Sequence, residues 1–242
     1  MPRGGPDWGT GAQRTVAGVS ADPGEIAARL GSPVTYSRTG TVIWLDTFEF
    51  GFGGWTRVTT GTGGAIALIT DPVHSGRFAV KLTGGSTGSG LAQITKYVYA
   101  LDPNSLGVEV TFQINTTDLK ELLIEFTQGG PDAVDFGIFF DGTAGEIYYL
   151  NSASAKVLLD TYGFGMGSNQ PFYVMKLVVD LVTRKFVRLH WNERTYDMAG
   201  ISGYLYTETD EPYFKSRIEV RSLAGSNEAV IVDNVIFTAN EP

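Results

Sequence analysis

From residue 64 to the C-terminus the chain consists of short β-type segments separated by turn residues, and this pattern constrains the fold most. The segments are rich in Val, Ile, Thr, Tyr and Phe, and Gly, Pro, Asn, Asp or Ser bound each of them, as is typical of strands. The expected strands are Gly64–Thr70, Arg77–Thr83, Gly90–Tyr99, Leu106–Asn115, Leu119–Thr127, Ala133–Phe140, Glu146–Leu150, Lys156–Leu159, Phe172–Leu181, Lys185–Trp191, Arg194–Met198, Tyr213–Ser222 and Ala229–Thr238. This series predicts an all-β fold, a two-sheet antiparallel jelly-roll β-sandwich.

Two of the joins between these segments have the length of hairpin turns. Asp180–Lys185 connects two long segments, and Asn192-Glu193 separates Trp191 from Arg194. Because antiparallel strands can be joined by such short turns, we expect each pair to be adjacent in a sheet.

The stretch Val42–Trp55 is expected to hold the first strand of the body. Its opening residues, VIWL, are apolar at every position, which indicates cover on both faces and hence a central strand. Asp46 and Glu49 follow where the apolar run ends. The last segment, Ala229–Phe237, has the same character and is interrupted by Asp233. We therefore predict that the two ends of the body are neighbours.

Composition and charge restrict the classes of partner. The chain has 242 residues, 43% hydrophobic, which suits one large sandwich domain. The net charge is −8; the first forty residues carry a net +1, which leaves −9 for the remainder. A nucleic-acid partner is therefore not expected, since phosphate binding needs a basic surface. The absence of cysteine excludes disulfides and thiolate chemistry.

Neither a membrane segment nor a secretion signal is expected. No apolar run approaches the roughly 18 residues of a membrane span. The opening MPRGGPDWGTGAQ lacks the apolar core of a secretory signal.

The N-terminal region reads as an arm. Residues 1–21 are rich in Gly, Pro, Ser and Thr without periodicity, which predicts an extended segment without a core of its own. One short helix is expected at about residues 23–30, with Asp22 as its cap and Gly31 at its end. We therefore divide the chain into an extended N-terminal arm with this short helix, residues 1–40, and a jelly-roll β-sandwich domain, residues 41–242.

So short a helix is not stable alone, and the arm is therefore expected to pack on the body or on a partner. The residues that we expect to contact a partner are Trp8, Arg14, Ile26 and Leu30. A disordered tail is the alternative.

Four segments of the body resemble known strand signatures. DTFEFGFGGW (46–55), SGRFAVKLT (75–83), FYVMKLVVDLVTRKFVRL (172–189) and IVDNVIF (231–237) resemble those of jelly-roll carbohydrate-binding modules and of laminin-G or concanavalin-like domains. The resemblance covers about residues 40–240 and implies the fold more than an activity.

This resemblance also implies a structural Ca²⁺ where the first and last strands meet. The matching positions are Asp46, Glu49, the backbone near Lys81, and Asp233, and hard oxygen ligands suit this ion. The alternative is that each carboxylate is solvated or paired with Arg57, Arg77 or Lys81. No cofactor is required on either interpretation.

A second resemblance covers the arm and the body together. The opening MPRGGPDWG, the short helix, and a D-x-F-E sandwich ending in VDNVIFTANEP are similar to structural proteins of tailed phages, including phages of thermophilic hosts.

The sequence offers little catalytic chemistry. Glu121 and Glu125 share a strand face, but their Cα atoms are about 13 Å apart at ~3.3 Å per residue, and Leu123 stands where the related hydrolases carry a carboxylate. The segment Gly84–Gly88 matches G-x-S-x-G but leads into another strand instead of a helix. We therefore predict no catalytic residue and no enzymatic activity.

Aromatic residues could stack on sugars. The candidates for such a glycan platform are Trp191, Tyr162 and Tyr148. Packing within the sandwich is the alternative for each of them.

Three classes of function compete at this stage. The main prediction is a non-catalytic virion structural protein on the particle surface, a capsid decoration or cement subunit. It would dock on a capsid or other virion protein through its arm, as a homo-oligomer, by resemblance a trimer. The alternative is a carbohydrate-binding, lectin-like module for host glycans or polysaccharides. A sandwich-fold glycoside hydrolase or lyase is the third.

Overall fold

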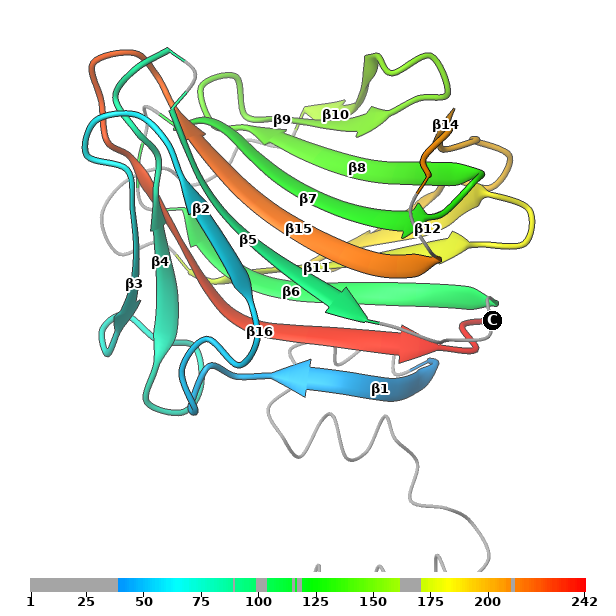
Figure 1. The fold of residues 1–242 in the computed structure, drawn as a ribbon, viewed down its shortest axis with the longest axis horizontal. Coiled ribbons are helices and arrows are strands. Elements are labelled where there is room, and N and C mark those ends of the chain that lie inside the picture. Colours follow the sequence, from blue (N-terminus) through cyan, green and yellow to red (C-terminus); the bar gives the residue numbers. More distant parts are fainter. Residues whose placement is uncertain are drawn as a thin grey trace, which may run out of the picture.

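The computed structural model describes residues 39–88, 90–98, 104–114, 116, 119–161, 171–209 and 212–242. These residues form sixteen strands in two antiparallel sheets of eight strands that lie face to face (Figure 1). No helix occurs among them, so none of the described residues belongs to a helix that could cross a membrane. The predicted all-β sandwich is confirmed. The predicted short helix and residues 1–38 of the predicted arm lie outside the described residues.

Sheet A has the strand order β13-β12-β11-β6-β16-β4-β3, and β1 pairs with β16 as well. Its strands are β1 Thr41–Asp46, β3 Ala65–Ile69, β4 Ala79–Thr83, β6 Ser105–Ile114, β11 Tyr173–Asp180, β12 Lys185–Trp191, β13 Arg194–Asp197 and β16 Ala229–Ala239. Both predicted hairpin turns are confirmed, because Asp180 pairs with Lys185 and Trp191 with Arg194.

Sheet B has the order β10-β9-β8-β7-β15-β5-β2, with β14 paired to β8. Its strands are β2 Thr56–Thr59, β5 Leu91–Val98, β7 Leu119–Gly129, β8 Ala133–Asp141, β9 Glu146–Leu150, β10 Lys156–Thr161, β14 Tyr204–Tyr206 and β15 Tyr213–Ser222. The short strands β2 and β14 were not predicted. All four residues of β2 are exposed, so no apolar alternation marks it in the sequence.

The prediction that the first strand, β1, is a central strand is wrong. Of the described strands, β16 alone pairs with it, although the predicted proximity of the first and last strands is confirmed (Figure 1, β1 blue and β16 red). Strand β16 has β4 beside its residues 229–232 and β1 beside its residues 235–239. The register of β16 against β6 shifts between Val232 and Val235. This irregularity divides one side of β16 between two shorter strands, which the apolar run VIWL could not reveal.

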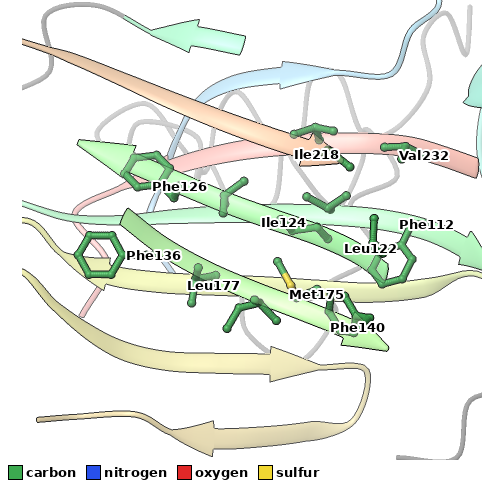
Figure 2. Close-up of a cluster of buried hydrophobic side chains, with 14 of the residues drawn as sticks. Phe112, Leu122, Ile124, Phe126, Phe136, Phe140, Met175, Leu177, Ile218 and Val232 are labelled. Atoms are coloured by element: carbon green, nitrogen blue, oxygen red, sulfur yellow. The ribbon is translucent and has the colours of Figure 1, made fainter. Parts of the chain in front are cut away.

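The core lies between the sheets and contains alternate residues of nearly every strand. Figure 2 shows how side chains of β7 and β8, such as Ile124 and Phe136, meet Met175 and Leu177 of β11 in this space. All four side chains are fully buried. Burial of this apolar surface stabilises the sandwich, because each large side chain removed from water contributes about 1.5–3 kcal/mol. Residues between these core positions point to the outer faces of the sheets.

Trp191, predicted as part of a glycan platform, belongs to the core. It has no solvent exposure, stacks on Tyr173 with ring centroids 5.3 Å apart, and packs against Phe112 and Phe140. A register shift between Val178 and Val179 of β11 against β12 sets which face of β12 turns inward. The aromatic sequence itself does not indicate this face, and the buried ring has no surface on which a sugar could stack.

We predict that Trp191→Ala lowers the free energy of unfolding by about 3–5 kcal/mol, as for other buried aromatic residues replaced by alanine. Urea unfolding followed by circular dichroism measures this change. Val182→Ala, at a position that is 69% exposed, is the control and should change stability by less than about 0.5 kcal/mol. Equal effects of the two variants would contradict the core assignment of Trp191.

Candidate functional site

The outer face of sheet B carries a line of charged side chains. Ile124 of β7 and Ile218 of β15 are core residues, so the residues on either side of them point outward. Glu125 lies opposite Arg217 in the register of the two strands. We call the following set the charge row: Glu121, Glu125, Arg217, Glu219 and Arg221.

Ion pairs connect the members of the charge row across β7 and β15. Arg217 lies 2.7 Å from Glu125 and 3.9 Å from Glu219, and Arg221 lies 2.5 Å from Glu219. The carboxylates are buried, with Glu125 and Glu219 only 4% and 2% exposed. The Arg217 and Arg221 side chains keep 30% and 37% of their surface accessible. The face therefore presents guanidinium groups to solvent, with the carboxylates beneath them.

Glu125 has an unusual electrostatic environment for a carboxyl group. Burial raises its pKa above the ordinary 4.5, an effect that the Arg217 charge opposes and the Asp135 charge reinforces. Asp135 lies on β8 opposite Thr127, and the Thr127 hydroxyl is 2.6 Å from Asp135 and 3.3 Å from Glu125. The Tyr206 hydroxyl also donates to Asp135, at 3.2 Å. Glu125 thus belongs to a connected polar network that crosses β15, β7, β8 and β14.

An apolar group adjoins the charge row on the same face. We call it the aromatic patch, and it consists of Leu123, Phe139, Leu150, Tyr148 and Tyr204. Its position is fixed by Gly137 of β8, where an added Cβ would lie 3.2–3.4 Å from Phe139, Leu123 and Leu150. Phe139 and Leu150 therefore approach each other over a strand position without a side chain.

Lys156 of β10 connects the aromatic patch to the charge row. Its ammonium lies 4.4 Å from the centroid of the Phe139 ring and forms an ion pair with Glu121. Tyr148 and Tyr204 form the rim of the patch and are partly exposed. The patch can therefore offer aromatic surface to a ligand next to charged hydrogen-bonding groups.

The predicted sugar-stacking residues lie in different environments, and the two predicted carboxylates lie on one face. Tyr148 lies in the aromatic patch, where its hydroxyl donates to Glu146. Trp191 is in the core, and Tyr162 lies outside the described residues. Glu121 and Glu125 share one face as predicted, with Leu123 between them in the aromatic patch. Each of these carboxylates is paired with a cation.

The three charged residues of β15 in the charge row were not predicted. A signal for them exists in the sequence, because RIEVR at residues 217–221 alternates charged and apolar residues along a strand. Such alternation indicates one polar face. The alternation does not show that Glu219, between the two arginines, is buried, or that Glu125 lies beside Arg217 on the neighbouring strand.

The carboxylates predicted to bind Ca²⁺ accept hydrogen bonds from the protein. Asp46 accepts from the Phe48 amide at 2.8 Å and the Trp55 indole at 2.9 Å. Glu49 accepts from the amides of Arg77 and Phe78, and these bonds lower its pKa. Among the described residues no group of three or more His, Cys, Asp or Glu side chains is arranged to hold a metal ion.

Two further positions of the predicted calcium set are engaged within the sheet and its loops. Asp233 is fully buried and accepts from the amides of His74 and Ser75 at 2.6 and 3.1 Å. Burial raises its pKa in spite of these bonds. Lys81 pairs with Ala67 on β3 and Ile231 on β16. Calcium binding stays a prediction. The backbone amides satisfy Oδ2 of Asp233, whereas its buried Oδ1 accepts no hydrogen bond from the described residues.

The remaining predicted sites are the G-x-S-x-G segment and four residues of the arm. The segment Gly84–Gly88 belongs to the connection between β4 and β5, so the described part of the G-x-S-x-G motif is followed by a strand as expected. The four predicted partner-binding residues of the arm lie outside the described residues.

Comparison with known proteins places the fold. No protein-family model matches the sequence, and no curated protein matches it. An endo-β-1,4-glucuronan lyase from the fungus Trichoderma reesei superposes with a TM-score of 0.54 and 12% identity, over 82% of this chain and 95% of the lyase chain. A β-glucanase from Bacillus licheniformis gives a TM-score of 0.50 and 11% identity, over 81% and 98% of the two chains. At these identities the likeness establishes a shared sandwich fold.

A phage protein is among the solved structures found in the comparison. The enzymatically active domain of bacteriophage CBA120 tailspike protein 4 has a TM-score of 0.42 and 15% identity, and the match covers 79% of this chain. The chain spans 20% of the length of that tailspike chain.

The prediction that this protein is not an enzyme is corrected by these comparisons. It rested on the spacing of Glu121 and Glu125 and on the G-x-S-x-G segment that leads into a strand, whereas proteins that are enzymes by name, a glucuronan lyase and a β-glucanase, have the same sandwich over nearly their whole length.

The ion pair between Glu125 and Arg217 generates a stability prediction. Arg217→Met leaves Glu125 buried without its cation, and we expect the free energy of unfolding to fall by about 2 kcal/mol. The double variant Glu125→Gln/Arg217→Met removes both charges and should recover part of this loss in urea unfolding. No recovery in the double variant would contradict a direct pair.

The same carboxyl group should give a pH dependence. Because its pKa is higher in the folded state than the ordinary 4.5, its contribution to stability is full below pH 4.5 and is lost as the pH rises through the folded value. The unfolding free energy of the natural protein minus that of Glu125→Gln should therefore become more positive as the pH falls toward 4.5. If this signed difference becomes more negative on acidification, the pKa of Glu125 is lowered in the folded state instead.

Proposed function

We propose that this protein binds a polysaccharide on the outer face of sheet B. The observation that carries the proposal is the aromatic patch next to the charge row. Sugar rings present apolar C–H faces that pack on aromatic side chains, and hydroxyl groups that hydrogen-bond to charged side chains. The partly exposed rings of Tyr148 and Tyr204 supply the first kind of contact. Arg217, Arg221 and Lys156 supply the second.

The shape of the face suits a chain-like ligand. The charge row follows β7 and β15 for several residues, and the aromatic patch crosses β7, β8, β9 and β14. Contacts distributed over this many strands fit several sugar units better than a single small molecule. The capsid role, the trimer, the virion location and a phage origin stay predictions, and no contact among the described residues supports them.

Binding assays with aromatic variants test the proposal. We expect the protein to bind at least one member of a polysaccharide panel, and Tyr148→Ala and Tyr204→Ala each to weaken binding by about tenfold, which corresponds to about 1.4 kcal/mol. Phe50→Ala is the matched control, because Phe50 is fully exposed on the turn after β1 and should leave affinity unchanged. Binding that persists in both tyrosine variants would contradict this site.

Polysaccharide cleavage is a second candidate, favoured by Glu125 of β7. Glu125 is buried with a raised pKa, and a carboxyl group in such an environment can act as a general acid. Glu121 is four residues away on the same strand, about 13 Å at Cα, which exceeds the separation of the carboxyl pairs in glycoside hydrolases. The raised pKa suits Glu125 to hold a proton and to donate it to a departing sugar oxygen.

Turnover measurements separate cleavage from binding alone. We expect Glu125→Gln to abolish any release of reducing ends from a bound polysaccharide while affinity changes less than threefold. The double variant Glu121→Gln/Glu125→Gln should behave in the same way. Unchanged turnover in Glu125→Gln would exclude this carboxyl group as the acid, and binding without turnover in the natural protein would leave recognition as the function.

A further inference from the structure

The groups that the charge row presents to solvent can donate hydrogen bonds but cannot accept them. Its carboxylates Glu125 and Glu219 are almost completely buried. The Arg217 and Arg221 side chains are partly accessible, and Lys156 on the same face is 45% exposed. Guanidinium and ammonium groups are donors only. A ligand that reaches this face therefore meets donors that require an acceptor.

The ion pairs of the charge row use only part of this donor capacity. Arg221 donates to Glu219 through Nε, and within the part of the chain that the structure describes its two terminal nitrogens have no hydrogen-bond partner. Arg217 donates to Glu125 through one terminal nitrogen, while its Nε has no partner among the described residues. A guanidinium group has five N–H donors, so each arginine can hold its carboxylate and bind a further acceptor.

Strand register gathers three cations at one end of the charge row. Arg221 of β15 lies opposite Glu121 of β7, and Lys156 of β10 forms an ion pair with the same Glu121. Burial lowers the pKa of Lys156, and the charges of Arg221 and Lys120 lower it further against the opposing charge of Glu219. Lys120 is exposed near the start of β7. We call Lys120, Lys156 and Arg221 the cation cluster.

Exposure of individual groups matters more for this surface than the net charge of the chain. That charge is −8, but exposed charges more than about 8 Å apart are largely screened at physiological ionic strength. Two further carboxylates, Asp141 and Glu146, are paired across β8 and β9. Asp141 accepts from amides of its own turn, and Glu146 accepts from the Tyr148 hydroxyl. These carboxylates are engaged within the protein, whereas the cation cluster retains unused donors.

We infer that the ligand of this face is an acidic polysaccharide, whose carboxylate or sulfate groups bind Arg221 and Lys156 of the cation cluster. The inference rests on the proposed function and names the class of polysaccharide. Two N–H groups of a guanidinium match two oxygens of such an anion, which gives a charge-assisted, bidentate pair. The hydroxyl groups of a neutral sugar form weaker bonds with the same donors.

The cation cluster and the aromatic patch are close enough to act on one ligand. The Lys156 ammonium lies 4.4 Å from the centroid of the Phe139 ring. An anionic group bound to Lys156 therefore places the sugar that carries it at the edge of the aromatic patch. Neighbouring sugars of the same chain then reach the partly exposed rings of Tyr148 and Tyr204. Charge and stacking thus contribute to the binding of one extended chain.

Ligand pairs that differ only in charge test the inference. Polymers of galacturonate, glucuronate and mannuronate are each compared with the same polymer after its carboxyl groups are reduced to alcohols, and dextran sulfate is compared with dextran. Titration calorimetry with the full chain measures the affinities. We expect at least one acidic polymer to bind about tenfold more tightly than its neutral partner, because hydrogen bonds to charged groups are the stronger ones. The pair that shows this difference identifies the anion as carboxylate or sulfate.

Charge variants locate the anion. Arg221→Gln should weaken binding of the preferred acidic polymer by about tenfold and leave the affinity for its neutral partner unchanged. Lys120→Gln, at an exposed position, should weaken it by about threefold. The matched control is Arg184→Gln, because Arg184 is 35% exposed and ion-paired with Asp132, in the turn at the other end of β7. It should change neither affinity, and circular dichroism verifies that all three variants fold.

The possible failures of the inference and of the proposed function differ. Equal affinities for the acidic and neutral members of every pair would overturn the inference and leave polysaccharide binding intact. Binding of an acidic polymer that neither Arg221→Gln nor Lys120→Gln weakens would place the anion elsewhere and would also overturn it. If no polymer binds, charged or neutral, the proposed function fails and the inference fails with it.

Discussion

The packing of two sheets against one apolar layer is the interaction on which the rest of this structure depends. Each long strand contributes alternate residues to that layer, and the residues between them are thereby directed outward. The charge row exists because Ile124 and Ile218 occupy core positions on neighbouring strands, which turns Glu125 and Arg217 to the same outer face. A shift of either strand by one residue would exchange the core and the site.

The two outer faces show different consequences of this constraint. On sheet B, partly exposed tyrosines and guanidinium groups lie together, and the carboxylates beneath them are satisfied by cations. On sheet A, Lys176 and Glu241 form an ion pair with almost no solvent exposure. Charges without exposure need both partners and added hydrogen bonds to offset their lost hydration. The Thr39 carbonyl and hydroxyl supply such bonds at the start of the described chain.

Local hydrogen bonding explains why several carboxylates near the first and last strands resemble a metal site in the sequence. Asp46, Glu49 and Asp233 each follow or interrupt an apolar run, a position in which a carboxylate needs donors. In the structure the donors are backbone amides of nearby loops and the Trp55 indole. The sequence indicates that these groups require partners, but a cation and a set of amides meet the same requirement.

Strand positions, the two hairpins and the all-β class were predictable from the sequence, because period-two alternation and turn residues are local signals. The proximity of β1 and β16 was predictable from their shared composition. Other features depend on contacts between distant segments: the edge position of β1, the inward face of β12 that buries Trp191, and the meeting of Glu125 with Arg217. Register and strand order decide these, since a pairing such as that of Glu125 with Arg217, 92 residues apart in the sequence, leaves no local trace. The sequence by itself determined which residues alternate, and the tertiary structure decided which face of each strand meets the core and which carries the site.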